Sequence, residues 1–381
     1  MDTTPFSSGQ VPTPLTPPPV IQPSPSRSSS RGLGWMIFAI ILAILLAFSL
    51  LGNLTQLVHR AVRFPGSLKS VGTARSSGPR LDESILEDND ASSKIAVITV
   101  DGIITGHTSD QAGNSMVDVI QAQLDRAKDD RRVKAVILRV DSPGGEVMAS
   151  DEIYRAIKKF QDDSGKPVVC SMGSLAASGG YYISSPCRWI VANELTITGS
   201  IGVIMHGWNY RGLMDKIGIE PMTYKSGKFK DMLSGDRSTN EIPVEERAMV
   251  QALIDQTYQK FKTVVANGRS AAHDANRLEG HALITDWAKY ADGRVLSGAD
   301  AMTYGFVDQL GDFHDAVART RKIAGIDNAN LVEYRERYDI SDFLHMFGQG
   351  ESAHDIKLDL GTDLPKLRAG YLYFLSPTVV N

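Results

Sequence analysis

The chain has 381 residues, of which 42% are apolar and 22% charged, and its formal net charge is −4. These values are typical of a globular protein longer than one average domain, and they exclude the basic footprint of a nucleic-acid-binding protein. The sequence has no C-x-x-C or H-E-x-x-H motif and no glycine-rich phosphate loop, so we expect neither a metal nor a cofactor.

The N-terminal region divides by composition. Residues 1–31 are rich in Pro, Ser and Thr and are predicted to be a disordered leader. Residues 32–51 carry no charge and would span roughly 30 Å as a helix, which predicts a transmembrane helix over 32–54. A cleaved signal peptide is the alternative. Basic residues flank the segment on both sides, so charge does not decide its orientation. The polar residues 55–93 are predicted to be a linker.

From residue 94, apolar runs of strand length alternate with segments of helical periodicity, which predicts parallel β-α-β units and an α/β core. The predicted strands are 95–100, 133–140, 167–170, 189–192, 201–205, 220–224 and 331–334. The predicted helices are 117–127, 147–160, 181–184, 243–267, 299–304 and 314–323. We assign residues 94–346 to this domain and 347–381 to a C-terminal tail that contains the apolar run 371–375.

The stretch 171–182 is the first candidate for chemistry. Ser178 stands where a predicted strand passes into a helix, and backbone N–H groups point outward at such a junction. Its neighbours on both sides are alanine or glycine, so a substrate carbonyl could approach the backbone closely. The arrangement is similar to a nucleophile elbow, with the Gly179 N–H as an oxyanion donor. A tightly packed helix start is the alternative.

Gly144 and Gly145 follow another predicted strand and should lie at the same edge of the sheet as Ser178. Their N–H groups could bind an oxyanion. The sequence Ser-Pro-Gly-Gly also strongly favours a turn, so a tight turn without a binding role is the alternative.

A serine nucleophile needs a base, and the residues leave several candidates open. His206 is the nearest histidine in sequence, although a solvated loop histidine is the simpler interpretation. Lysine is the other option, since burial can make its amine a usable base. The candidates in the following loop are Lys225, Lys228 and Lys230. The two cysteines, Cys170 and Cys187, are expected to be buried thiols, with a disulfide as the alternative.

Five short stretches occur together in this chain: D-S-P-G-G (141–145), A-A-S-G-G-Y-Y (176–182), T-G-S-I-G-V (198–203), S-G-K-F-K-D (226–231) and D-G-R-V (292–295) followed by G-F-V-D (305–308). In this order they resemble the signal peptide peptidase A family of membrane-anchored serine proteases. The resemblance covers residues 94–325. The family usually has Leu where this chain has Phe306, a position expected to pack rather than react.

The resemblance implies a Ser/Lys dyad. The nucleophile would be Ser178, and the general base would be the lysine immediately before the aspartate of the loop, Lys230. Ser200 would position that lysine. The implied oxyanion donors are the N–H groups of Gly145 and Gly179.

The resemblance also implies a fold class, a partner and a location. The fold would be α/β, with the repeated ββα units of Clp protease and the crotonases, in a homo-oligomer. The protein would be a single-pass enzyme of the bacterial plasma membrane that degrades cleaved signal peptides and other apolar peptides on the outer face. A catalytically silent oligomeric membrane scaffold and a crotonase-type acyl-CoA enzyme are the alternatives. The apolar residues expected beside the site are Met172, Leu175, Ile201 and Val203.

Overall fold

The computed structural model describes residues 40–42, 46, 78–107, 114–277, 279–337 and 372–375. The predicted leader 1–31, nearly all of the predicted membrane anchor 32–54 and most of the predicted tail 347–381 lie outside these ranges. Within them, no helix combines the length and the apolar character needed to cross a bilayer. The chain divides into two units, Met1–Arg75 and Ser76–Asn381, and the architecture below is that of the second.

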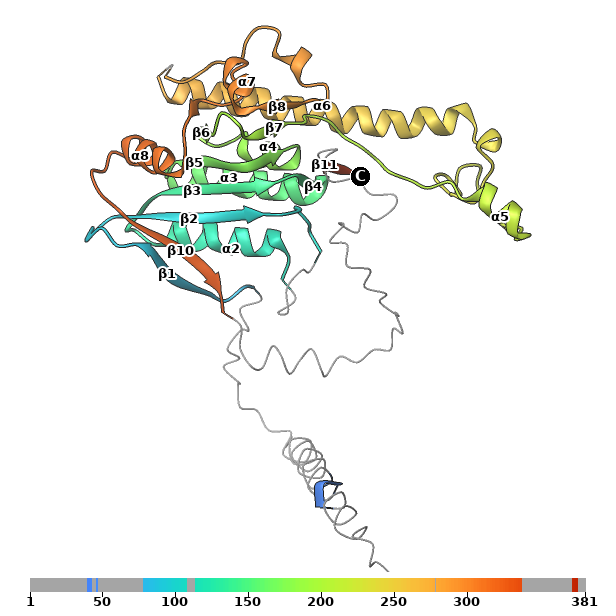
Figure 1. Ribbon diagram of the computed structural model, residues 1–381, viewed down its shortest axis with the longest axis horizontal. Helices are drawn as coiled ribbons and strands as arrows, with labels where there is room; N and C mark the ends of the chain where they lie inside the picture. The colour runs from blue at the N-terminus through green and yellow to red at the C-terminus, as the bar shows by residue number, and fades with distance from the viewer. Residues whose placement is uncertain are drawn as a thin grey trace, which may run out of the picture. The chain divides into compact units, whose positions relative to one another are not determined.

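A mainly parallel β-sheet forms the centre of this unit (Figure 1). Its strands lie in the order β1, β10, β2, β3, β5, β6, β9, and β1 at the edge is antiparallel to β10. A short antiparallel pair, β7 and β8, joins the end of β5. The strands are β1 (Leu81–Glu87), β2 (Lys94–Asp101), β3 (Val133–Ser142), β5 (Val168–Ala177), β6 (Trp189–Ala192), β7 (Ile197–Gly199), β8 (Val295–Ser297), β9 (Gln309–Leu310) and β10 (Asn330–Glu336).

Helices cover both faces of the sheet, so its central strands are buried on both sides, as parallel strands usually are. In β2, Ile95 and Val97 pack in the cluster around Val317 of α8. Ile98 and Val100 face the opposite cluster, to which α2, α3 and α4 contribute. The helices are α2 (Met116–Asp129), α3 (Val147–Ser164), α4 (Gly179–Ser184), α5 (Arg211–Ile217), α6 (Val244–Ala275), α7 (Gly298–Thr303) and α8 (Phe313–Ala324), with 3-10 turns at Thr239–Glu241 and Trp287–Tyr290.

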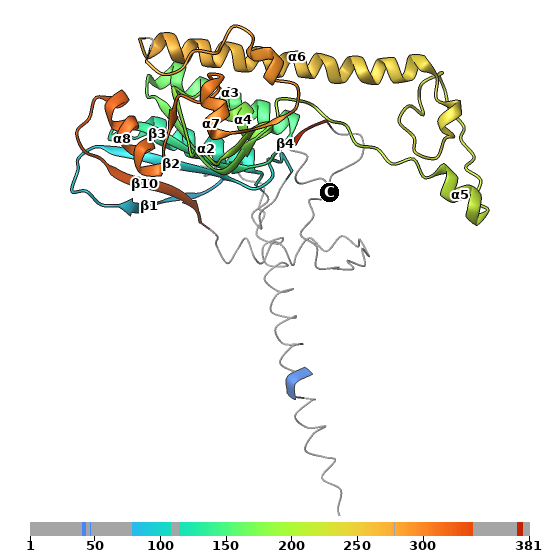
Figure 2. The same ribbon diagram turned by 45° about the horizontal axis from the view of Figure 1, so that its top comes forward.

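Residues 206–243 and the first half of α6 form an extension of the domain, which we call the arm. α6 has 32 residues and is therefore about 48 Å long. Its second half packs in the core through Phe261 and Val265, whereas Met249 and Leu253 in the first half are 41% and 46% exposed. Figures 1 and 2 both show α5 and the adjoining loops at the end of α6 that is remote from the sheet.

A second, two-stranded sheet lies at the carboxyl end of β3. It pairs β4 (Gly144–Glu146) with β11 (Tyr373–Leu375), a segment of the predicted tail, in antiparallel register. β3, β4 and α3 follow one another as one ββα unit.

Three predicted elements differ in the structure. Residues 81–87, expected within the linker 55–93, form β1, because an edge strand that is largely exposed can keep a polar composition. Residues 220–224 form no strand; Met222 and Tyr224 are strongly exposed, with no neighbouring strand to pair with in the described part of the arm. Of residues 201–205, only Ile204 makes a ladder contact, with Tyr373.

Candidate active site

Ser178 lies between β5 and α4 and has an unusual backbone. Its φ is 54° and its ψ is −115°, a region that residues other than glycine rarely adopt. Its N–H donates to the Gly199 carbonyl at 2.9 Å, and its own carbonyl accepts from the Tyr182 N–H at 2.8 Å. These bonds hold a strained residue at a helix start, as in a nucleophile elbow.

The Ser178 side chain is unusual as well. The residue is 1% exposed, and its Oγ has no hydrogen-bond partner among the residues that the structure describes. A buried hydroxyl without a partner is costly, so such groups in native proteins are often kept for a function.

Glycines let the start of α4 approach β4 closely. A Cβ on Gly179 would lie 2.7 Å from Ser150 Oγ and 3.1 Å from the Gly145 nitrogen. A Cβ on Gly180 would lie 2.8 Å from the Ser142 carbonyl oxygen. The two expected oxyanion donors, Gly145 and Gly179, are therefore neighbours next to Ser178.

The Gly145 N–H is directed away from Ile104. On that side of β4, the Ile104 N–H donates to the Gly144 carbonyl at 2.9 Å, and the Ile104 carbonyl accepts from the Glu146 N–H at 2.8 Å. Because backbone polar groups alternate between the two edges of a strand, the Gly145 N–H faces the other edge, where β11 lies.

Ser200 lies just after β7 and, like Ser178, has a positive φ. Its φ is 50°, its N–H donates to the Arg294 carbonyl at 2.7 Å, and the residue is 3% exposed. It lines a cavity of about 430 Å³ whose other side is formed by α6, including Tyr258. Since Gly199 bonds to Ser178, the segment that carries Ser200 is fixed beside the nucleophile candidate.

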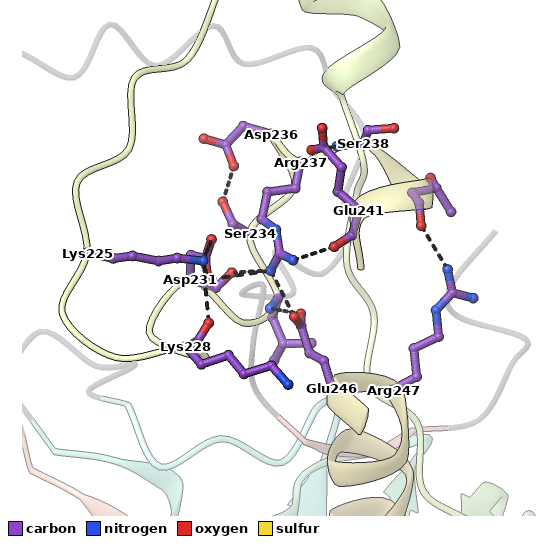
Figure 3. Close-up of polar contacts among 12 residues, drawn as sticks. Lys225, Lys228, Asp231, Ser234, Asp236, Arg237, Ser238, Glu241, Glu246 and Arg247 are labelled. Carbon is purple, nitrogen blue, oxygen red and sulfur yellow. Dashed lines mark hydrogen bonds and ion pairs between the residues drawn. The ribbon is translucent and has the colours of Figure 1, made fainter. Parts of the chain in front are cut away.

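Lys230 lies in the arm, in a loop held by ion pairs (Figure 3). Lys225 Nζ is 2.7 Å from both carboxylate oxygens of Asp231. Arg237 Nη1 is 3.5 Å from Asp231 and 2.8 Å from Glu246 in the first turn of α6. The hydrogen bond from Lys225 is the main cause that lowers the pKa of Asp231 below its usual value. The network fixes the loop to α6, and Lys230 itself is exposed.

Lys230 and Ser178 are not brought together within one chain. The loop of Lys230 is fixed at Glu246, whereas α6 lines the Ser200 cavity from Gln251 to Tyr258, about 8 to 18 Å further along the helix. Figures 1 and 2 show the same separation between the outer end of the arm and α4.

The other candidate bases are paired elsewhere or exposed. Lys228 Nζ pairs with Glu245 at 3.4 Å on the arm surface, and Lys225 is bound to Asp231. His206 is exposed where the arm begins. In the described ranges, no cluster of three or more His, Cys, Asp or Glu side chains could hold a metal ion.

A buried ion pair behind α4 was not anticipated from the sequence. Arg269 of α6 pairs with Asp308, and its Nη1 donates to the Cys187 carbonyl at 2.9 Å. Asp308 also accepts from the Ile190 N–H at 2.8 Å. Burial opposes the charge of Arg269, but the carboxylate of Asp308, together with Tyr181 and Cys187, outweighs burial and raises the pKa of the guanidinium. Asp308 is the last residue of the G-F-V-D stretch, so the sequence could have indicated that this aspartate has a role. No motif pointed to Arg269.

The remaining expectations near the site concern apolar packing. Cys170 and Cys187 are buried and free, and burial raises the pKa of the Cys187 thiol well above its usual value. Buried thiols were expected, and the alternative of a disulfide is wrong. Met172 and Ile201 belong to the core, whereas Leu175 and Val203 are only partly buried.

Comparison with known proteins finds two matching family models and several related proteases. The model of peptidase family S49 matches residues 160–327, and the Clp protease model matches residues 91–188. A signal peptide peptidase, SppA, of Enterococcus faecium is 36% identical over 262 residues, which cover 67% of this chain and 71% of that protein. Protease 4 of Salmonella typhi is 36% identical over 69% of this chain but 40% of its own length. The chloroplastic serine protease SPPA of Arabidopsis thaliana is 33% identical over 67% of this chain and 36% of its own.

Proposed function

This chain belongs to the signal peptide peptidase A family, peptidase family S49, and we propose that it cleaves apolar peptides through a Ser178–Lys230 dyad completed between two protomers. As a member of that family it is a serine-type peptidase with a Clp protease-like α/β domain. The observation that carries the proposal is the buried, unpartnered Ser178 Oγ beside the Gly145 and Gly179 N–H groups.

The reaction would proceed through an acyl-enzyme. Ser178 Oγ attacks the substrate carbonyl carbon, and its proton passes to the neutral amine of Lys230. The N–H groups of Gly145 and Gly179 stabilise the oxyanion. The C–N bond breaks, and the leaving amine takes the proton back from the lysine. Water then attacks the ester and loses a proton to the same lysine, which returns that proton to Ser178 Oγ as the C–O bond breaks and the new carboxyl group is released.

Completion of the dyad by a second protomer is supported by three features. Lys230 is exposed and fixed far along the arm from its own Ser178. A cavity of about 430 Å³ lies open beside Ser200, where the positioning serine is expected. The arm also exposes large apolar side chains, which are typical of an interface between subunits. Examples are Trp208, Leu213, Ile217 and Met222.

The location and the natural substrate belong to the same proposal. We place the anchor at residues 32–54 and the catalytic domain on the outer face of the bacterial plasma membrane, where cleaved signal peptides would be released. The support is the apolar, uncharged run of that segment and the name of the Enterococcus faecium relative.

A fluorophosphonate probe tests the proposal on the assembled protein. We expect covalent labelling of the wild-type protein at Ser178 and none of the Ser178→Ala variant. Ser164→Ala is the matched control, because the Ser164 hydroxyl makes local bonds with the Phe160 carbonyl and the Lys166 N–H at the end of α3, and labelling should persist. An unlabelled wild-type oligomer would favour the silent scaffold instead.

A further inference from the structure

The edge of β4 that faces away from β11 is covered by the segment that follows β2. Ile104 of this segment pairs with Gly145 in a parallel bridge. The approach is close, because a Cβ on Gly145 would lie only 1.9 Å from the Ile104 carbonyl oxygen. The Gly145 N–H points from the opposite edge, so its position depends on where residues 104–107 hold this strand.

The Glu146 carboxylate contacts three consecutive residues of this segment. Its Oε2 accepts from the Gly106 N–H at 3.0 Å, and its Oε1 accepts from the Thr105 hydroxyl at 3.3 Å. His107 Nδ1 lies 2.9 Å from Oε1, where a protonated imidazole would form an ion pair with the carboxylate. The His107 N–H closes the turn by donating to Thr105 Oγ1 at 3.1 Å. Hydrogen bonds to an ionised acceptor are stronger than neutral ones, so the carboxylate adds a firm link between β4 and this turn.

Glu146 does not use its carboxylate for the helix that it precedes. It is the N-cap residue of α3, a position where a side chain commonly accepts from an N–H of the first turn. At the described start of α3 the Glu146 side chain makes no such bond, and only 14% of it is exposed. This mostly buried carboxylate is therefore directed at residues 105–107 rather than at its own helix.

The Glu146 main chain is linked to the second oxyanion donor as well. Its carbonyl accepts from the Ser150 hydroxyl at 2.9 Å, and Ser150 is fully buried. A Cβ on Gly179 would lie 2.7 Å from the same hydroxyl oxygen, so Ser150 packs against the start of α4. The position of Glu146 thus affects both N–H groups that would hold the oxyanion.

We propose that Glu146 is a positioning residue of the oxyanion site: its carboxylate holds residues 105–107 against β4 and so keeps the Gly145 N–H aimed at the reacting carbonyl. The inference rests on the proposed peptidase function and adds to it a residue that acts through the neighbouring strand. Oxyanion donors act on charge that develops in the transition state, and their effect depends on preorganisation. Loss of the carboxylate should therefore lower kcat and leave KM nearly unchanged.

The test measures kcat and KM of peptide hydrolysis on the full-length assembled protein, with kcat expressed per Ser178 labelled by a fluorophosphonate. Glu146→Ala should lower kcat by about tenfold to a hundredfold, less than the loss of a whole oxyanion donor, with KM within about twofold. Glu146→Gln should keep at least about a third of the wild-type kcat, because its amide oxygen still accepts from the Gly106 N–H. Thr105→Val should also lower kcat, and its effect should be smaller in the Glu146→Ala background.

The matched control is Glu152→Ala, because Glu152 is an exposed glutamate of α3, the helix that follows Glu146. Both of its kinetic constants should equal the wild-type values. A wild-type kcat per labelled site in Glu146→Ala, or equal losses in Glu146→Ala and Glu146→Gln, overturns the inference, and so does a loss confined to KM. Absence of any hydrolysis by the wild-type protein would instead reject the proposed function itself, so the two failures are distinguishable.

Discussion

Ser178 and Lys230 occupy opposite environments in the same chain: the serine hydroxyl is buried without a partner among the described residues, and the lysine is exposed on the arm. Each residue therefore lacks what the other would supply. Ser178 lacks an acceptor for its proton, and Lys230 lacks the apolar surroundings in which a lysine amine becomes neutral. This complementarity is the reason for assigning the dyad to two protomers.

Replacing Ser178 should separate activity from stability. Ser178→Ala should lower peptide hydrolysis by at least about a thousandfold, because the residues of such a dyad act as a unit. The free energy of unfolding should change by less than about 1 kcal/mol, since the hydroxyl makes no hydrogen bond to any residue that the structure describes. Ser178→Gly should be equally inactive yet more stable, by about 1 kcal/mol, because glycine relieves the strain of φ 54°. Chemical denaturation and a peptide assay measure both effects, and a glycine variant less stable than the alanine variant would contradict the account.

The two lysines of the K-F-K segment should behave differently. Lys230→Ala should be as inactive as Ser178→Ala, whereas Lys228→Ala should retain activity, because Lys228 pairs with Glu245 on the surface and lies over the Phe229 ring. The wild-type rate should also rise toward alkaline pH, since a lysine must be neutral to accept a proton. The reverse order of the two variants, or a rate that is flat down to mildly acidic pH, would speak against Lys230.

Asp231 should act as a positioning residue for the loop of Lys230. Its lowered pKa means that the ionised carboxylate stabilises the folded loop above the ordinary value of 3.8, and that this contribution is lost as pH falls through the lowered value. Amide hydrogen exchange of residues 225–247, corrected for intrinsic rates, should therefore show loss of protection below about pH 4, near the usual aspartate range. Asp231→Asn should show the loss already at neutral pH, with reduced kcat. Unchanged protection in that variant would show that Asp231 does not position the loop of Lys230.

The buried Arg269–Asp308 pair should be important for stability. Asp308→Ala leaves the guanidinium buried without its carboxylate and removes the acceptor of the Ile190 N–H. We expect a loss of about 3–5 kcal/mol in the free energy of unfolding. Lys158→Ala, which breaks an exposed pair with Asp162, should cost less than about 1 kcal/mol. Similar losses in denaturant titrations of the two variants would disagree with this assignment.

The sequence predicted the central strands well, because each is a short apolar run followed by turn or helix signals. The strand around Val97 and the strand-to-helix turn at Ser178 lie where they were expected. The arm could not be foreseen: Met249 and Leu253 have helical spacing, but periodicity does not distinguish a residue of the core from one left exposed.

Non-local pairing accounts for most of the other differences. The edge strand β1 is polar and gains its structure from β10, some 250 residues later. The segment around Phe374 was recognised as apolar, but its pairing with Gly145 depends on contacts that no local pattern encodes. The separation of Ser178 from Lys230 likewise follows from the length and direction of α6 rather than from any motif.

Mixing two inactive variants tests the shared dyad most directly. Ser178→Ala and Lys230→Ala chains with different tags are coexpressed, and the mixed oligomer is isolated by both tags. A dyad between protomers predicts that peptide hydrolysis returns, to about a quarter of the wild-type rate if the chains mix at random and each site draws one residue from each neighbour. Pairing Lys230→Ala with the double variant Ser178→Ala/Lys230→Ala is the control and should stay inactive. A mixed oligomer without activity, formed by chains that assemble normally, would contradict the account.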